Sequence, residues 1–400
     1  MRVLATVLIW VMGAALGLAS PVAAQSRLVQ GGAQIVATDA GGVTVRFAIS
    51  QAVPFSVHTR VNPMQVILDT QQVDWSGLQA NMLTGAPYFT DLRVGRMRSG
   101  WSRLVLTLAA PMAIDQAGLQ QSDTGAQLML KLVPTTADHF AALAHAPDDP
   151  RFTLAPPVLA RAAAIDKDAL HVVLDPGHGG IDPGATRGSI TEADLMLSLA
   201  RQVQEALLRE GIEVTLTRAE DDFIPLPQRV AIAHDLGADL FISLHADTVE
   251  QGQVSGASVY TLAQQASDTA SARLAAEHDR DALLAGVDLQ GQKDDVARVL
   301  MDLARLDTQP RSESLATHMV GALAARVPIL ATQPHRQADF SVLRSADIPS
   351  VLIEAGFLSS QADLTNLQDP QWRAGFTAAI VEGITVWADE DALLAPLRRK

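Results

Sequence analysis

The chain has 400 residues, of which 48% are hydrophobic and 18% charged, so it can form two or three globular domains, and bulk disorder is excluded. Its 30 Lys and Arg residues against 44 Asp and Glu residues give a net charge of −14, which makes nucleic acid an unfavourable partner. Because cysteine is absent, disulfides, thiol nucleophiles and Cys-ligated zinc are excluded, and any metal must be held by His and carboxylate side chains.

The first 24 residues are typical of an export signal. Arg2 is followed by an apolar run of about 16 residues and then by a stretch of small residues that ends at Ala24. A permanent membrane anchor is the alternative, but a spanning helix needs about 20 apolar residues. We therefore expect residues 1–24 to be cleaved as a signal peptide, leaving no transmembrane anchor.

Residues 25–134 alternate between apolar and polar side chains with a period of two, for example at 43–49, 104–108 and 128–132. This pattern predicts an all-β, sandwich-like domain. The next stretch, 135–168, contains several prolines and shows no sustained periodicity, so we expect a linker there.

From 169 to 390 short apolar strands alternate with amphipathic helices, which predicts an α/β domain whose mixed, largely parallel sheet is flanked by helices. Between 268 and 326 the pattern indicates two or three consecutive helices, of which about 268–310 form an insertion. The expected strands are 172–174, 212–217, 239–244, 256–262, 340–343 and 350–353. The expected helices are 191–210, 226–236 and 371–388.

Two of the ten histidines follow predicted strands directly. His178 lies in a glycine-rich turn after the strand at 172–174, and His245 lies at the exit of the strand at 239–244. Because the carboxyl ends of parallel strands share one edge of a sheet, we expect these two imidazoles to converge. The other eight histidines are interpreted as solvated or core residues.

A zinc site with an open position commonly uses two histidines and one glutamate. Glu192 is the best candidate for the glutamate because it begins the helix that follows the His178 turn. Glu354 ends an apolar strand, where a carboxylate is costly to bury unless it is paired or functional, so we interpret it as a general base. The alternatives are a plain helix-start glutamate at 192 and a turn-capping carboxylate at 354.

Four segments, in order, resemble the zinc-dependent N-acetylmuramoyl-L-alanine amidases of bacterial cell-wall turnover: VVLDPGHGGIDPGA, TEADLMLSLA, DLFISLHAD and PSVLIEAGFLSS. The resemblance covers about residues 170–388. It implies that His178, Glu192 and His245 hold one Zn²⁺ per chain and that Glu354 is the catalytic glutamate. The family often has a basic residue after the ligand glutamate, where this chain has Ala193.

The implied reaction is hydrolysis of the amide that joins the lactyl group of N-acetylmuramic acid to L-alanine of the stem peptide. The resemblance further implies a periplasmic enzyme that acts on peptidoglycan in wall remodelling and daughter-cell separation. Two other functions stay open from the residues alone. One is a non-catalytic peptidoglycan-binding envelope protein, and the other is a zinc peptidase that cuts within the stem peptide.

The insertion at 268–310 resembles the helical insertion of division-associated amidases, in which a helix covers the zinc until an activator protein of the LytM/EnvC-like type displaces it. We expect Glu277, Asp279 or Asp281 to occupy the open zinc position in an autoinhibited state. The alternative is a peripheral, solvated helix.

The β domain resembles the AMIN domain, which localises such enzymes and binds peptidoglycan. Arg93, Arg96 and Arg98, near Trp101, are candidates for contact with glycan or acidic stem peptides. A solvated strand face is the alternative.

Overall fold

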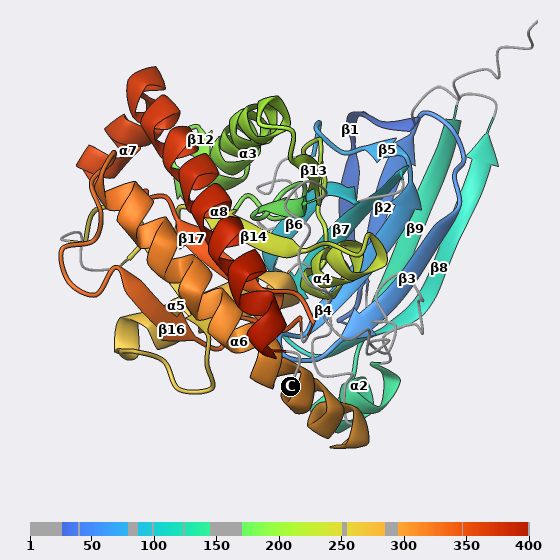
Figure 1. Cartoon of the computed structure of the whole chain (residues 1–400). Coiled ribbons are helices and arrows are strands. Elements are labelled where there is room, and N and C mark those ends of the chain that lie inside the picture. Colours follow the sequence, from blue (N-terminus) through green and yellow to red (C-terminus); the bar gives the residue numbers. More distant parts are fainter. Residues whose placement is uncertain are drawn as a thin grey trace, which may run out of the picture.

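The computed structural model describes residues 26–38, 41–78, 87–97, 100–122, 125–144, 170–249, 254–284, 295–345 and 347–398. The predicted signal peptide and most of the predicted linker lie outside these residues. Figure 1 shows the strands of the N-terminal part, in blue to cyan, beside an α/β part in green to red. No helix in the described ranges is long and apolar enough to cross a membrane.

Two sheets of the N-terminal part share one apolar core. Val45 and Phe47 of one sheet and Leu104 and Leu106 of the other belong to the same buried cluster, as the period of two predicts. The first sheet has the order β5-β1-β2-β9-β8 and comprises β1 (Ser26–Ala37), β2 (Val43–Ile49), β5 (Val73–Asp74), β8 (Met112–Ser122) and β9 (Gly125–Pro134). The second has the order β3-β4-β7-β6 and comprises β3 (Phe55–Arg60), β4 (Gln65–Gln71), β6 (Phe89–Met97) and β7 (Trp101–Leu108).

A short helix, α2 (Ala137–Leu143), lies inside the stretch that the sequence predicts to be a linker. Its N-cap is Thr136, whose side chain accepts a hydrogen bond from the backbone N–H of His139. Phe140 is buried in the core of the β sheets. The start of the predicted linker is therefore packed against the N-terminal part.

The C-terminal part is built on a six-stranded sheet in the order β13-β10-β14-β17-β15-β16. Neighbouring strands are parallel except for the antiparallel pair β15 and β17, which confirms the predicted mixed, largely parallel sheet. The strands are β10 (His171–Pro176), β13 (Glu213–Leu216), β14 (Leu240–His245), β15 (Ser258–Leu262), β16 (His335–Ala338) and β17 (Ser350–Glu354). A separate ribbon is formed by β11 (Thr186–Arg187) and β12 (Ile190–Thr191).

Helices cover both faces of this sheet. On one face Leu199, Met319 and Phe376 share a core with Ile242, and on the other face Phe241 packs in a second core. The helices of the first face are α3 (Glu192–Arg209), α6 (Asp295–Ala324) and α8 (Pro370–Arg398), preceded by the short α7 (Gln361–Gln368). The second face carries α4 (Leu226–Asp235), α5 (Thr269–Leu284) and the 3₁₀ turn η4 (Ser341–Leu343).

One expected strand is wrong. Residues 340–343 lead into and form η4, and the edge strand is β16, a few residues earlier. Phe340, Val342 and Leu343 are all buried, but a segment of four residues with three apolar side chains is too short for its periodicity to separate a strand from a helical turn. The described residues between 268 and 326 form two of the expected helices, α5 and α6.

The sheet register brings the predicted site residues to one edge. His245 is paired directly with Glu354 on the neighbouring strand, and the loop after β10 starts beside them, because the N–H of Gly177 donates to the carbonyl of Leu244. A Cβ at Gly177 would lie 2.3 Å from the His245 ring. Only glycine lets the chain leave β10 this close to the imidazole.

Candidate metal centre and active site

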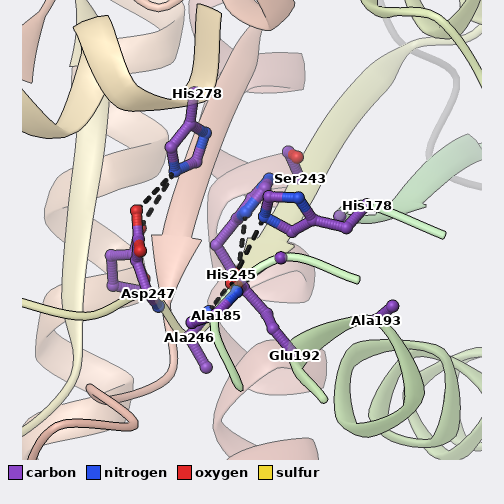
Figure 2. Close-up of polar contacts among 12 residues, drawn as sticks. His178, Ala185, Glu192, Ala193, Ser243, His245, Ala246, Asp247 and His278 are labelled. Carbon is purple, nitrogen blue, oxygen red and sulfur yellow. Dashed lines mark hydrogen bonds and ion pairs between the residues drawn. The ribbon is translucent and has the colours of Figure 1, made fainter. Parts of the chain in front are cut away.

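Three of the predicted residues meet at the carboxyl edge of the sheet. One nitrogen of His178, one nitrogen of His245 and one carboxylate oxygen of Glu192 all lie within 4.8 Å of one another, and all three side chains are buried (Figure 2). His178 Nε2 lies 3.3 Å from Glu192 Oε2, and His245 Nδ1 lies 3.0 Å from Glu192 Oε1. The convergence that the strand ends predict is therefore present.

The loop after β10 aims His178 at this cluster. His178 has a left-handed backbone with φ of 58°, and its carbonyl accepts a hydrogen bond from Arg229 at 2.8 Å. Asp182 Oδ2 lies 2.8 Å from His178 Nδ1, which leaves Nε2 facing Glu192 and His245. Burial opposes protonation, but the carboxylates of Asp182 and Glu192 raise the pKa of His178 well above its ordinary value.

Asp182 is a site residue that the sequence analysis missed. A carboxylate bound to the second ring nitrogen of a ligating histidine fixes its tautomer and orientation, and that is the geometry here. The available signal was the spacing of four residues from His178. In an irregular loop that spacing predicts no contact, so only the fold reveals the pair.

Glu192 is held rigidly in the first turn of α3. Its two carboxylate oxygens accept hydrogen bonds from backbone N–H groups, Oε1 from Ala246 at 2.8 Å and Oε2 from Ala185 at 3.0 Å. The helix starts here because Thr191 is the N-cap and accepts from the N–H of Asp194. Although burial favours the neutral acid, His178 and His245 hold the pKa of Glu192 well below its ordinary range.

His245 provides the second imidazole in its neutral form. Burial and the neighbouring His278 ring lower the pKa of His245 to about 4. A neutral imidazole has a free lone pair, which is the form that binds a metal ion. Its position is set by β14, since it is the last residue of that strand.

These residues fit a zinc ion. Two imidazole nitrogens and one carboxylate are a common three-ligand set for catalytic zinc. Within the described ranges, His178 Nε2 is buried and lacks a hydrogen-bond partner, although it points at the other two ligands. A buried nitrogen without a partner is costly unless it binds something, and a cation at this cluster would satisfy it.

Glu354 lies next to the cluster at the end of β17. The side chain is fully buried, and its Oε2 accepts a hydrogen bond from the N–H of Asp247 at 3.1 Å. Its Oε1 has no hydrogen-bond partner among the described residues. Burial, and next the charge of Asp247, raise the pKa of Glu354 well above its ordinary value. A carboxyl group of raised pKa beside a metal site can both accept and return a proton.

His278 of α5, which the sequence analysis interprets as a solvated or core histidine, also reaches this site. It is buried, and its Nε2 lies 3.3 Å from Asp247 Oδ2 and 3.9 Å from Glu354 Oε1. Its ring centroid is 4.2 Å from that of His245 (Figure 2). Nothing in the local sequence marks it, because the packing of α5 across the sheet edge brings it there.

Two of the three acids of α5 that the sequence offered as occupants of the zinc position have other surroundings. Asp279 accepts a hydrogen bond from the Ser341 hydroxyl at 3.0 Å. Glu277 lines a cavity of about 400 Å³ between α5 and the segment that follows His245. The side chain of Asp281 lies outside the described part of the chain. Among the described residues, the metal-type cluster contains only the three predicted ligands.

Comparisons with known proteins match this part of the chain. A family model described as N-acetylmuramoyl-L-alanine amidase matches residues 172–386, which contain all the residues of the site. The chain is 39% identical over 215 residues to the N-acetylmuramoyl-L-alanine amidase AmiA of Escherichia coli K12, covering 53% of this chain and 74% of that protein.

Two longer matches extend beyond the α/β part. The chain is 29% identical over 358 residues to the N-acetylmuramoyl-L-alanine amidase AmiC of Escherichia coli O6:H1, covering 84% of both chains. It is 28% identical over 371 residues to AmiC of Neisseria meningitidis serogroup B, covering 86% of both chains. The similarity therefore includes residues outside the 172–386 match.

Proposed function

Because this chain belongs to the N-acetylmuramoyl-L-alanine amidase family and hydrolyses the bond between N-acetylmuramic acid and L-alanine in peptidoglycan, we propose that His178, Glu192 and His245 hold its zinc ion and that Glu354 is its general base. The observation that carries this proposal is the buried cluster of the three ligand side chains beside the carboxyl group of Glu354. Asp182 is the residue that orients His178.

Zinc bound by these residues would polarise the scissile carbonyl and lower the pKa of water to about 7. Glu354 accepts a proton from the attacking water through Oε1, the oxygen that has no hydrogen-bond partner among the described residues. The new C–O bond forms at the lactyl carbonyl carbon, and the C–N bond to L-alanine breaks. Glu354 then returns the proton to the departing amine nitrogen, which its raised pKa favours.

The helix α5 acts as an autoinhibitory cover in this proposal. His278 occupies space beside His245 and Glu354 that a substrate amide needs, and its contact with Asp247 holds it there. Asp268 accepts hydrogen bonds from the N–H of Ser271 and from Arg336, which fixes the start of the helix. An activator of the LytM/EnvC-like type would have to move α5 before substrate enters.

The protein works in the periplasm, reached through the signal peptide at 1–24, and residues 25–134 are an AMIN-type module that binds peptidoglycan. The length of the AmiC matches supports this assignment, because they include residues outside the α/β part. The role follows as wall remodelling during daughter-cell separation. Filled ligand and base positions argue against a non-catalytic wall-binding protein, and family membership argues against a peptidase that cuts within the stem peptide.

Metal content tests the zinc assignment directly. Purified full-length protein is expected to carry one zinc per chain by elemental analysis, and His245→Ala is expected to carry none. His139→Ala, which changes an exposed histidine on α2, is the matched control and should keep the metal. Zinc retained by His245→Ala at the wild-type level would contradict the ligand assignment.

Product analysis tests the bond that is cut. Mass spectrometry of purified muropeptides after digestion should show peptide-free glycan that keeps the lactyl group, together with intact stem peptide. Shortened stem peptides would instead identify the peptidase. Absence of any product from zinc-loaded protein that lacks residues 275–300 would identify a protein without catalytic activity.

A further inference from the structure

Strand β6 of the N-terminal part lies directly against the α/β part. The N–H of Phe223 donates to the carbonyl of Arg96 at 2.9 Å, and Met97 forms a parallel bridge with Phe223. The Arg96 guanidinium lies 2.8 Å from Glu220 and 3.0 Å from Asp222. Arg96, which the sequence offered as a glycan contact, is therefore engaged with the catalytic part.

The other two arginines offered as glycan contacts are outside this contact. Arg93 pairs with Asp91 within its own strand, and Arg98 lies outside the described residues. The contact of β6 with the catalytic part thus depends on Arg96 and its immediate neighbours.

The two backbones touch, and glycine is required on both sides. A Cβ at Gly95 of β6 would lie 2.0 Å from the backbone nitrogen of Ile181. A Cβ at Gly180 would lie 2.2 Å from the carbonyl oxygen of Arg96, and Gly180 also has a φ of 60°. No side-chain rearrangement relieves a clash between backbone atoms, so this close fit is specific to glycine.

An apolar cluster seals the same contact. Ile181 is only 2% exposed and packs with residues from three strands of the second β sheet and with Phe223. The strand residues are Ile67, Met97 and Val105. The side chain of Ile181 is thus buried by the β domain, and its burial is lost if the two parts separate.

Ile181 immediately precedes Asp182, the residue that orients His178. Gly179 and Asp182 exchange backbone hydrogen bonds of 2.7 and 3.1 Å, and the N–H of Gly180 donates to Asp221 at 2.8 Å. The turn at 179–182 is therefore held between the β domain on one side and the catalytic part on the other. Displacement of Ile181 would move Asp182 and, through it, the His178 ring.

We infer that the β domain is a positioning element of the metal site, because its docking face (Ile67, Gly95, Arg96, Met97 and Val105) clamps the turn at 179–182 that aligns Asp182 with His178. The inference rests on the zinc site proposed above. It gives the β domain a second task, independent of wall binding. Separation of the docking face from the turn at 179–182 is expected to weaken zinc binding. It should also slow the hydrolysis of small soluble muropeptides, which does not depend on attachment to the wall.

Gly95→Val in the full-length protein tests this inference, because valine suits a strand but its side chain would meet the backbone of Ile181. Competition with a chromogenic chelator should show a zinc dissociation constant raised about 10-fold or more, as expected when support behind a ligand is lost. Hydrogen exchange of the metal-free protein should be faster at 179–182. Gly118→Val is the matched control, since Gly118 lies on β8 with no atom near its absent Cβ.

A charge exchange provides the second variant. Arg96→Glu faces Glu220 and Asp222 with a like charge and should weaken zinc binding, and adding Glu220→Arg should restore part of the loss. Lys131→Glu, at an exposed ion pair with Asp115 on the other sheet, should change neither the zinc dissociation constant nor hydrogen exchange at 179–182. A folding defect alone would not be rescued by the exchange.

Faster exchange at 179–182 with an unchanged zinc dissociation constant would overturn the inference, and so would unchanged exchange in both Gly95→Val and Arg96→Glu. Neither result would affect the zinc site itself. If the wild-type protein binds no zinc, the proposed function fails instead.

Discussion

Replacement of Glu354 tests whether proton transfer can be separated from metal binding, as its proposed role as general base predicts. Glu354→Gln keeps the size of the side chain and the acceptor for the N–H of Asp247, but it removes the atom that accepts a proton. We expect zinc content to be unchanged and turnover of soluble muropeptides to fall by about 10²–10⁴-fold. Glu205→Gln, at an exposed ion pair on α3, should retain normal turnover. Near-normal turnover in Glu354→Gln would remove the base assignment.

Asp182 contacts His178 at Nδ1, the ring nitrogen that does not face the other two proposed ligands. Asp182→Ala removes the partner of His178 Nδ1, so the ring loses its fixed tautomer and orientation. The zinc dissociation constant, measured by chelator competition, is expected to rise about 10–100-fold. Asp235→Ala changes an exposed carboxylate and serves as the control. Equal affinities of Asp182→Ala and the wild type would show that the backbone alone aligns the imidazole.

Asp175 supplies stability that depends on pH. This fully buried carboxylate accepts from Thr217, Ser243 and Arg229 at 2.6, 2.7 and 2.8 Å. Burial favours the neutral acid, but Arg229 and the two hydroxyls lower the pKa of Asp175 below its ordinary value. A lowered pKa adds stability above the unfolded pKa, about 4, and this stability is lost as pH falls through the folded pKa.

Asp175→Asn should therefore destabilise the protein at pH 7, by about 3–5 kcal/mol, because Arg229 stays buried without its charge partner. Urea unfolding followed by fluorescence measures the difference. The gap between variant and wild type is expected to narrow below about pH 4, because Asp175 takes up a proton in the unfolded chain at a higher pH than in the folded protein. A gap that stays constant from pH 7 to the acid limit would contradict this account.

At the scale of elements, the proposal that α5 covers the site can be tested at His278. His278→Ala removes the ring that packs on His245 and the contact with Asp247. Basal turnover of soluble muropeptides is expected to rise at least about fivefold, the lower end of typical coupling between a regulatory element and a site. Deletion of residues 275–300 should raise it as well.

His139→Ala, on the remote helix α2, should leave the basal rate unchanged. No rise in either His278→Ala or the deletion would show that α5 is a fixed wall of the site. A loss of activity together with a loss of zinc would instead make His278 a supporting residue of the metal centre.

Elements with local signals could be predicted from the sequence. The start of α3 follows from the Thr191 cap, its end from Gly211 with a φ of 82°, and the convergence of His178 and His245 from their places at strand ends. His278 could not be predicted, because its neighbour Asp247 is distant in sequence and only the packing of α5 joins them. The docking of β6 was equally hidden, since glycine in a strand does not show what approaches it.

At the scale of the whole molecule, we propose two roles for the N-terminal part, attachment to the wall and support of the metal site. Removal of residues 25–134 should lower both co-sedimentation with insoluble peptidoglycan and zinc affinity. Gly95→Val should lower only the zinc affinity, because the β domain stays attached to the chain and its other surfaces are unchanged. Loss of co-sedimentation in Gly95→Val would mean that the wall is bound by a surface shared by both domains.

The direct pairing of His245 with Glu354 limits where substitutions can change the substrate preference of such an enzyme. Their separation is one interstrand spacing, about 4.8 Å, a length that the hydrogen bonds of neighbouring peptide groups impose and that substitutions elsewhere barely change. The sheet therefore fixes the distance between the backbones of His245, the proposed ligand, and Glu354, the proposed base. We therefore expect changes in substrate preference to arise in the segments that border this pair, namely the turn at 179–182, the residues after Asp247 and the face of α5.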